Sequence, residues 1–478
     1  MSFLQETPDS ITLYSERRRM TPGDGASVAF ENGKIEVSAG SVPLCFLRVR
    51  WQHELPAGTR FCGDAWERTY GDAAWRGFEP SRMMPWYFFA QLPDSTVAAC
   101  GVKVRPGCFA AWTADPDGVS LWCDIRSGGR GVLLNGRTLA VAEVASELYS
   151  GISAYAATRK FCAQLCPDPI FPAAPVYGSN NWYYAYGNIT EASVLEDCRY
   201  LAELTAGLEN RPFMVMDDGW QKRLKDHNNF GPWDCGNVNF PDMPHLAEKM
   251  KAYGVRPGIW YRPLFLNDPS LKRECFLRDM PYTLDPSHPE VLEIVTKDVT
   301  RLREWGFELI KHDFTTYDVA GRYAFDMHPW PCENGWTFYD QTRTTAEILT
   351  DLFRTIRKAA GPVLIMGCNT IGHLAAGLQE LSRTGDDTSG WYWDRTRKMG
   401  VNTVAFRGAQ HLSPKPGILN AEENNELKRL LAIASKGKIN AEPLDWQENT
   451  CPELWRINGK ERRFDWFEAD GGEPDFLW

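Results

Sequence analysis

The sequence lacks the features that mark membrane, secreted and nucleic-acid-binding proteins. Its apolar runs are shorter than the ~18–20 residues of a membrane helix, and its first residues form neither a basic nor an apolar segment, so no signal peptide is expected. Basic residues are in the minority, with 52 Lys and Arg against 62 Asp and Glu, and no basic run is longer than Arg17–Arg19. Because phosphate backbones require a basic surface, we expect neither a nucleic-acid nor a membrane partner.

Cysteine and histidine also lack the spacing of disulfide scaffolds and common metal sites. The 13 cysteines are odd in number and contain no C-x-x-C pair, and the 8 histidines contain no H-x-x-x-H pair. In a chain of this length, scattered cysteines are typical of reduced thiols in a cytoplasmic enzyme. We therefore predict a cytoplasmic location, no metal site and no cofactor.

Aromatic residues are what the sequence has in excess. The chain contains 19 Trp, 17 Tyr and 24 Phe, which together make up 13% of its 478 residues. The hydrophobic fraction of 43% and the charged fraction of 24% are ordinary and exclude disordered and fibrous proteins. The length predicts two or three domains. Sugars, with flat apolar faces and polar edges, suit an aromatic-rich site, although packing uses most aromatic residues.

Residues 1–172 have the pattern of an antiparallel β-sandwich. Short apolar segments are separated by Gly, Pro, Asp and Asn, and Asn135-Gly136 is a hairpin signal. The expected strands include 27–30, 34–37, 43–51, 97–104, 119–125 and 131–134. A Pro-rich segment, 167–172, follows a short helical stretch and ends this predicted domain.

From residue 175 onward, short apolar strands alternate with helices. The expected strands are 176–182, 213–216, 255–261, 307–310 and 363–366. Apolar residues three and four positions apart predict helices near 194–202, 245–253, 290–302, 348–356 and 422–435. We expect Ser287 and Glu290 to form the capping box of the third of these helices.

This alternation predicts an α/β fold, a catalytic (β/α)₈ TIM barrel over residues 173–445. The alternating region spans 175–443, which is close to the ~250 residues typical of such barrels. A doubly wound sheet is the rival, but no Gly-x-Gly-x-x-Gly follows any expected strand. Residues 446–478 are expected to form a short β tail with a hairpin around Asn458-Gly459.

Polar side chains follow several of the expected strands of the barrel. They are Asn180, Asn181 and Trp182 after the first strand, then Asp217 and Asp218, Arg262, Asp313, Cys368 and Asn369, and Asp386 and Asp387. Catalytic groups of (β/α)₈ barrels lie where strands end and the following loops begin. We therefore expect these side chains to converge at one mouth of the barrel.

Paired carboxylates at such a mouth fit glycoside hydrolysis. A retaining enzyme uses one ionised carboxylate to attack the anomeric carbon and one protonated carboxyl to protonate the leaving oxygen. Lys311 lies two residues before Asp313 and so points to the same side of the strand. Its ammonium would favour an ionised Asp313 and could also donate to a sugar hydroxyl.

Four motifs in this order resemble glycoside hydrolase family 36, the α-galactosidase group, in the clan shared with families 27 and 31. The motifs are VMDDGW at 215–220, GIWYRP at 258–263, IKHDF at 310–314 and RTGDD at 383–387. The stretch GDAWERTYGD at 63–72 also resembles the N-terminal β-domain of short members. The resemblance covers most of the chain.

The resemblance implies a retaining mechanism without a metal. It implies that Asp313 is the nucleophile and Asp386 the acid/base. Asp387 is a substrate-binding candidate and the rival acid/base, since adjacent carboxylates on an extended segment point to opposite sides and one of them faces Asp313. The resemblance implies that Asp217 and Asp218 bind the 4- and 6-hydroxyls of the sugar. The other positions that it brings into the sugar pocket are Trp260, Lys311 and Cys368.

Two further residues are candidates from their positions alone. Arg383 is placed to contact the acid/base or the substrate, although an ordinary surface ion pair is the alternative. Trp182, like Trp220, Trp391 and Trp393, is either a sugar-stacking or a core side chain.

The sequence departs from the family pattern near the expected sugar pocket. His312 stands where the family has an aromatic residue, and 369–373 and 383–389 replace the family's usual runs. We predict a retaining exo-glycosidase that releases terminal α-linked galactose-type sugars from small oligosaccharides. An α-N-acetylgalactosaminidase, a pentopyranose-specific or other clan glycosidase, a transglycosidase and a non-catalytic carbohydrate-binding protein stay open as alternatives, as does a homo-oligomer.

Overall fold

The computed structural model describes residues 6–383, apart from short gaps, and three later strands. The gaps are residues 17, 22–23, 68–74, 223–230, 278–279, 323–326, 328 and 333–334. The later strands are β19 (Ala441–Pro443), β20 (Leu454–Ile457) and β21 (Lys460–Arg463). The helix expected over 422–435 lies outside the described residues.

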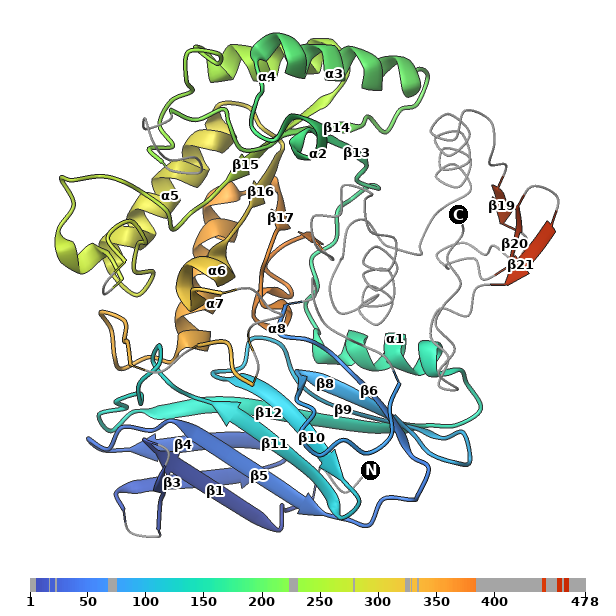
Figure 1. Cartoon of the computed structure of the whole chain (residues 1–478), viewed down its shortest axis with the longest axis vertical. Helices are drawn as coiled ribbons and strands as arrows, with labels where there is room; N and C mark the ends of the chain where they lie inside the picture. The colour runs from blue at the N-terminus through green and yellow to red at the C-terminus, as the bar shows by residue number, and fades with distance from the viewer. Residues whose placement is uncertain are drawn as a thin grey trace.

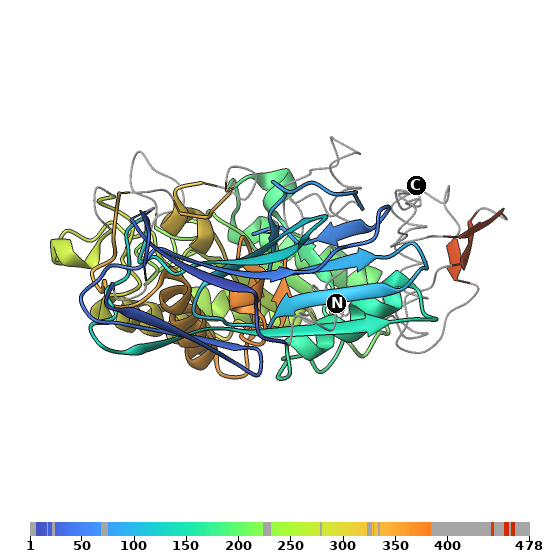
Figure 2. The ribbon, with the colours of Figure 1, turned by 90° about the horizontal axis from the view of Figure 1, so that it is seen from below.

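The first 150 residues form two antiparallel sheets of six strands each. The first sheet has the order β2-β1-β5-β11-β10-β7 and the second the order β3-β4-β12-β9-β8-β6. Both lie at one end of the molecule, below the parallel sheet in Figure 1 and nearest the viewer in Figure 2. The strands are β1 (Ser10–Ser15), β2 (Arg18–Arg19), β3 (Ala26–Glu31), β4 (Lys34–Ala39), β5 (Phe46–Gln52), β6 (Arg60–Gly63), β7 (Met84–Pro85), β8 (Tyr87–Gln91), β9 (Val97–Val102), β10 (Phe109–Asp115), β11 (Gly118–Asp124) and β12 (Thr138–Tyr149).

Side chains from both sheets meet in one hydrophobic cluster. Along β4, Ile35, Val37 and Ala39 are buried and alternate with exposed or half-exposed residues, as a strand with one covered face requires. Phe88 of the second sheet makes an edge contact with Trp112 of the first, with ring centroids 5.6 Å apart. The cluster also includes side chains of helix α1 (Ala154–Leu165), which follows the last strand.

One expected strand and one expected hairpin in this region are wrong. Residues 131–134 form no strand and contribute only the isolated bridge between Leu44 and Val132. Asn135 and Gly136 have the positive φ angles of a hairpin turn, 51° and 88°. The strand after this turn, β12, pairs instead with β4 and β9, because long-range packing selects its partners.

The following residues form a six-stranded parallel sheet in the order β13-β14-β15-β16-β17-β18 (Figure 1). This order follows the chain without the reversal that a doubly wound sheet contains. The strands are β13 (Gly178–Asn180), β14 (Phe213–Met216), β15 (Arg256–Tyr261), β16 (Leu309–His312), β17 (Leu364–Gly367) and β18 (Leu381–Ser382). Every residue of β14 and β16 is buried, as parallel strands covered on both faces require.

Helices connect these strands and lie outside the sheet in Figure 1. They are α2 (Trp182–Ala185), α3 (Glu191–Leu204), α4 (Met243–Ala252), the 3₁₀ helix η2 (Arg273–Cys275), α5 (Pro289–Glu304), α6 (Thr315–Ala320), α7 (Thr345–Ala360) and α8 (Gly372–Ala375). None of the helices in the described part of the chain combines the length and apolar character that a bilayer span requires.

The start of α5 differs from the capping box expected at Ser287. His288 is the N-cap, and its side chain accepts a hydrogen bond from the Glu290 backbone N–H. Pro289 explains the shift, because proline favours the first helical position and so places the cap at the residue before it. Ser287 donates to Asp285 Oδ1 instead, at 2.6 Å.

The three later strands form a separate antiparallel sheet, β19-β20-β21. Ile457 pairs with Lys460, so a two-residue connection joins β20 to β21. The strands that flank the expected hairpin pair with each other, while Asn458 and Gly459 themselves lie outside the described residues.

Candidate active site

Asp313 follows β16 directly, at the carboxyl edge of the parallel sheet, and is 6% exposed. Three N–H groups donate to its carboxylate. Trp260 Nε1 lies 3.0 Å from Oδ2, Asn369 Nδ2 lies 2.9 Å from Oδ1, and the Phe314 backbone N lies 2.7 Å from Oδ1. Oδ1 thus accepts two hydrogen bonds and Oδ2 accepts one, which fixes the carboxylate plane while Oδ2 keeps a free lone pair.

Two of these three donors belong to residues with an unusual backbone. Phe314 has φ 61° and Asn369 has φ 56°, both in the left-handed region. Such a conformation costs about 1–3 kcal/mol in non-glycine residues and is concentrated at functional sites. It turns the chain sharply after β16 and after β17, so that both residues face Asp313.

Lys311 and Asp217 form a buried ion pair beside Asp313. Lys311 Nζ lies 2.6 Å from Asp217 Oδ2, and both side chains are at most 6% exposed. Asn180 Nδ2 donates to the same oxygen at 2.8 Å, and Asn181 Oδ1 accepts from the Asp217 backbone N–H at 2.9 Å. Burial is the largest single influence and would lower the pKa of Lys311, but Asp217, Cys368 and Asp313 together outweigh burial and raise that pKa above its usual value.

Asp218 is held next to Asp217 by its own set of contacts. Gln221 Nε2 donates to Asp218 Oδ1 at 2.6 Å, and the Asp218 backbone N donates to Asp217 Oδ1 at 2.9 Å. Gln221 Oε1 in turn accepts from the Gly219 backbone N–H at 3.1 Å. Both carboxylates of the Asp217-Asp218 pair are therefore fixed at the end of β14.

Trp260 is packed on several sides and 1% exposed. Its ring makes an edge contact with Trp233 at 5.7 Å and with Phe314 at 6.5 Å, and its backbone oxygen accepts from Trp220 Nε1 at 2.9 Å. The polar contact of its indole N–H is with Asp313. The structure thus gives Trp260 the position of an orienting donor to that carboxylate.

No family model and no curated protein matches the sequence. Among solved structures, the α-galactosidase TtGalA of Thermus thermophilus, in complex with p-nitrophenyl α-D-galactopyranoside, is similar with a TM-score of 0.55 and 17% identity. That match covers 95% of this chain and 96% of the Thermus chain. The fold is that of the α-galactosidases.

Two further α-galactosidase structures support this likeness. One, from family 36 of Geobacillus stearothermophilus, in complex with raffinose, has a TM-score of 0.53 and 15% identity, over 81% of this chain and 60% of that chain. The other, from Lactobacillus brevis, has a TM-score of 0.52 and 14% identity, over 91% and 74% of the two chains. The resemblance to family 36 that the motifs indicate is thus confirmed at the level of the fold.

Cys368, which the family resemblance led us to expect in the sugar pocket, follows β17 and is fully buried. Burial, with a further contribution from Asp313, raises the pKa of the Cys368 thiol to about 12. Arg383 Nη1 donates to its sulfur at 3.3 Å, so Arg383 lies at the same edge of the parallel sheet. Asp386 and Asp387, the expected acid/base and its alternative, lie outside the described residues, as do Trp391 and Trp393.

His312 and Trp182 each pack against another aromatic ring. His312 is 1% exposed, its ring lies 5.8 Å from that of Phe353, and burial lowers its pKa to about 4. Trp182 does not extend the first strand as expected but begins α2, because its backbone N–H donates to Asn180 Oδ1 at 2.9 Å. The Trp182 ring contacts that of Tyr186 at 5.5 Å.

A second buried ion pair supports the turn after Asp313. Arg262 Nε lies 3.1 Å from Asp318 Oδ2, and the Arg262 guanidinium lies 4.4 Å from the centre of the Phe314 ring. Burial raises the pKa of Asp318 to about 6 against the lowering effect of Arg262. The Asp318 backbone N–H donates to the Phe314 oxygen at 2.7 Å.

The strand-end pattern placed Asn369 at the sheet edge that carries Asp313, and the structure puts it there. The sequence did not predict its hydrogen bond to Asp313, nor the roles of Gln221 and Asp318. Gln221 and Asp318 lie within a loop and a short helix, where residue type and spacing carry no such signal.

Proposed function

We propose that this protein is a retaining exo-glycoside hydrolase that releases a terminal α-linked galactose-type sugar. The observation that supports this most directly is Asp313, a nearly buried carboxylate with three N–H donors at the carboxyl edge of a parallel sheet. Groups fixed in this way need little reorganisation when they attack, which is a main source of catalytic rate.

In the proposed reaction, Asp313 Oδ2 attacks the anomeric carbon while Asp386 gives its proton to the leaving oxygen. The carbon–oxygen bond to the leaving group breaks as the bond to Asp313 forms. Asp386 then takes a proton from water while the water oxygen attacks the same carbon, and the bond between that carbon and Asp313 breaks, which regenerates the Asp313 carboxylate. Asp387 is the alternative acid/base.

The Asp217-Asp218 pair and Lys311 are proposed to bind the sugar hydroxyls. Their mutual hydrogen bonds hold acceptors and a cation close together, beside Asp313. A galactose-type ring presents adjacent hydroxyls that need both kinds of partner. Cys368, Arg383, Trp260 and Trp182 are proposed to complete the pocket wall.

The ligands of the similar structures support this substrate class. Thermus thermophilus TtGalA was solved with p-nitrophenyl α-D-galactopyranoside and with stachyose, and the Geobacillus enzyme with raffinose. We further propose a complete (β/α)₈ barrel over 173–445 behind an N-terminal β-sandwich over 1–172, which the parallel strands in chain order support. A cytoplasmic location stays a prediction.

Hydrolysis of a panel of p-nitrophenyl glycosides tests the substrate. We expect turnover of the α-galactoside above that of the α-N-acetylgalactosaminide, α-glucoside and β-L-arabinopyranoside. A preference for another sugar would replace galactose in the proposal. Transfer products formed with sucrose as acceptor would indicate a transglycosidase, and sugar binding without any turnover would indicate a carbohydrate-binding protein.

Matched variants separate Asp386 from Asp387 as the acid/base. Asp386→Ala should lower kcat on a natural oligosaccharide by about 10²–10⁴, with a much smaller loss on an aryl glycoside, whose leaving group needs no protonation. Asp387→Ala should lower the activity on both substrates by the same factor. The reverse pattern would assign the acid/base to Asp387.

A further inference from the structure

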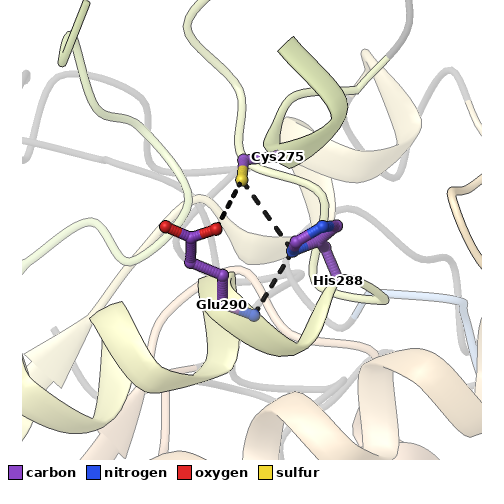
Figure 3. Close-up of side chains that lie close together, drawn as sticks. All are labelled: Cys275, His288 and Glu290. Carbon is purple, nitrogen blue, oxygen red and sulfur yellow. Dashed lines mark hydrogen bonds between the residues drawn. The ribbon is translucent and has the colours of Figure 1, made fainter. Parts of the chain in front are cut away.

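Three potential metal ligands, Cys275, His288 and Glu290, lie close together (Figure 3). Cys275 is the last residue of η2, in the loop after β15, while His288 and Glu290 lie at the start of α5. Cys275 Sγ lies 3.8 Å from His288 Nδ1 and 3.6 Å from Glu290 Oε2. All three ligand atoms lie within 4.8 Å of one another.

These separations match the edges of a tetrahedral zinc site. Zinc binds sulfur at about 2.3 Å and nitrogen or oxygen at about 2.0–2.1 Å, so neighbouring ligand atoms in a tetrahedron are about 3.5 Å apart. The two measured separations are within a few tenths of an ångström of that value. A thiol, an imidazole and a carboxylate are also the ligand types that zinc and its chemical analogues select.

The tautomer of His288 suits metal binding through Nδ1. The Glu290 backbone N–H donates to Nδ1 at 3.3 Å, so Nδ1 carries the lone pair and Nε2 carries the proton. Glu274 Oε1 lies 3.7 Å from Nε2. A carboxylate on the far nitrogen of a metal-binding histidine is the usual arrangement that orients the ring.

The burial of the cluster leaves a route for an ion. Cys275 is fully buried and His288 is 7% exposed, whereas the Glu274 side chain is 49% exposed and Glu290 is partly exposed. An ion would enter from the solvent side, where Glu274 and Glu290 lie, and the Cys275 sulfur would be its most buried ligand.

We propose that Cys275, His288 and Glu290 bind one zinc-class divalent cation, with water as the fourth ligand and Glu274 orienting His288. Binding breaks the Cys275 S–H bond, forms a sulfur–metal bond and releases the proton to solvent. The imidazole lone pair moves from the long hydrogen bond with the Glu290 N–H to the metal. No electron is transferred.

Such an ion would fasten the loop after β15 to the first turn of α5. The Cys275 backbone oxygen already accepts from the Asp285 N–H at 2.8 Å, and Asp285 Oδ2 accepts from the Tyr339 N–H at 2.7 Å. The loop begins at Arg262, which lies beside the Asp313 turn. The spacing of these ligands in the sequence indicated no metal site, since Cys275 and His288 are brought together only by the folded loop.

Cobalt titration of the full-length protein tests the site. Cys235 is the exposed cysteine among those described, so all variants should carry Cys235→Ser to remove a surface thiol. In this background we expect one Co²⁺ per chain and a thiolate-to-cobalt charge-transfer band in the near ultraviolet. Competition with Zn²⁺ should abolish the band.

Variants of the ligands decide whether this cluster is the site. Cys275→Ser should lose the band. His288→Asn keeps a good helix cap but removes the imidazole, and Glu290→Gln keeps the side-chain length, so both should lose stoichiometric binding while remaining folded. Glu274→Gln should weaken affinity by about tenfold or more. Glu293→Gln, an exposed neighbour on α5, is the control and should bind like the parent.

A thiolate band that persists in Cys275→Ser would overturn the proposal, as would the absence of cobalt binding at micromolar concentrations. If Cys275→Ser fails to fold, His288→Asn decides, and unchanged binding there would equally overturn it. The readout is metal binding, so its outcome is independent of glycosidase activity.

Discussion

At the scale of single residues, Asp313 is held by donors from three neighbouring segments. Trp260 donates from β15, Phe314 from the turn after β16, and Asn369 from the turn after β17. Two of those turns have left-handed backbone at a non-glycine residue. The carboxylate orientation therefore depends on the local path of three strand ends, and single substitutions there should change rate more than stability.

Asn369→Gly should lower kcat about ten- to a hundredfold and change KM much less. The variant removes the Nδ2 donor to Asp313 Oδ1 but tolerates φ 56°. Asn369→Ala should show the same kcat and, because alanine is strained at this φ, a lower melting temperature. Steady-state kinetics and thermal unfolding of the pair separate the two effects. Unchanged kcat in Asn369→Gly would contradict the role of the hydrogen bond.

His312 should make the protein sensitive to acid. Burial lowers its folded pKa to about 4 from an unfolded value of 6.5, so the unfolded state binds the proton first and stability is lost as pH falls from 6.5 towards 4. Relative to His312→Phe, the free energy of unfolding should fall by about 2 kcal/mol between pH 7 and pH 5. Urea unfolding at the two pH values measures this. Equal pH dependence in both proteins would contradict it.

At the scale of elements, the Lys311–Asp217 pair connects strands that are not neighbours. Lys311 lies on β16 and Asp217 follows β14, with β15 between them in the sheet. The ion pair therefore bridges across β15 and fixes the ends of β14 and β16 relative to each other.

Lys311→Met should destabilise the protein by about 3–5 kcal/mol, because it leaves Asp217 buried without its cation. Asn180 and the Asp218 backbone N–H still donate to Asp217, which places the expected loss at the lower end. In an Asp217→Asn background the same change should cost clearly less. Urea unfolding of the four proteins gives the coupling energy. A coupling energy near zero would show that the Lys311–Asp217 ion pair does not contribute to stability.

Several elements could be predicted from the sequence because their signals are local. The apolar run 213–216 matches β14, and helix α7 matches the expected apolar spacing. Parallel strands that are buried on both faces appear in the sequence as continuous apolar runs. The buried face of a helix appears as apolar residues spaced three and four positions apart. The expected strand at 131–134 failed because strand pairing depends on partners elsewhere in the chain.

The candidate site was predictable in part for the same reason. The strand ends placed Asp217, Asp218 and Asp313 at one edge of the sheet, and the structure puts them there. Asn369 approaches Asp313 only because of the turn after β17, and Asp318 contacts Arg262 only because α6 begins directly after Phe314. Such contacts depend on register and loop path, which residue type does not reveal.

At the scale of the whole molecule, the antiparallel sheets contact the region that carries α7. Arg137 Nη2 lies 2.7 Å from Glu347 Oε2, and the Thr344 hydroxyl donates to the Gly107 oxygen at 2.8 Å. Gly128 also lies against Trp336, and its backbone N–H donates to the Thr345 hydroxyl at 2.8 Å. The N-terminal region thus supports the helix behind β17.

Gly128→Ala should lower the free energy of unfolding by about 1–3 kcal/mol more than Gly136→Ala does. Both glycines have positive φ, at 63° and 88°, so both substitutions strain the backbone. A Cβ at Gly128 would lie 2.8 Å from the Trp336 ring, whereas a Cβ at Gly136 meets nothing within 4 Å. Urea unfolding of the two variants isolates the contact between the regions, and equal losses would show that it contributes little.

The central claim, that Asp313 attacks the sugar, is tested most directly by Asp313→Ala on an activated aryl α-galactoside with and without azide. Without azide, activity should fall by about 10³ or more, since the variant lacks the nucleophile. Azide fits the space left by the carboxylate and should restore turnover, with a β-galactosyl azide as the product. Activity close to that of the unsubstituted protein, in the absence of azide, would contradict the account.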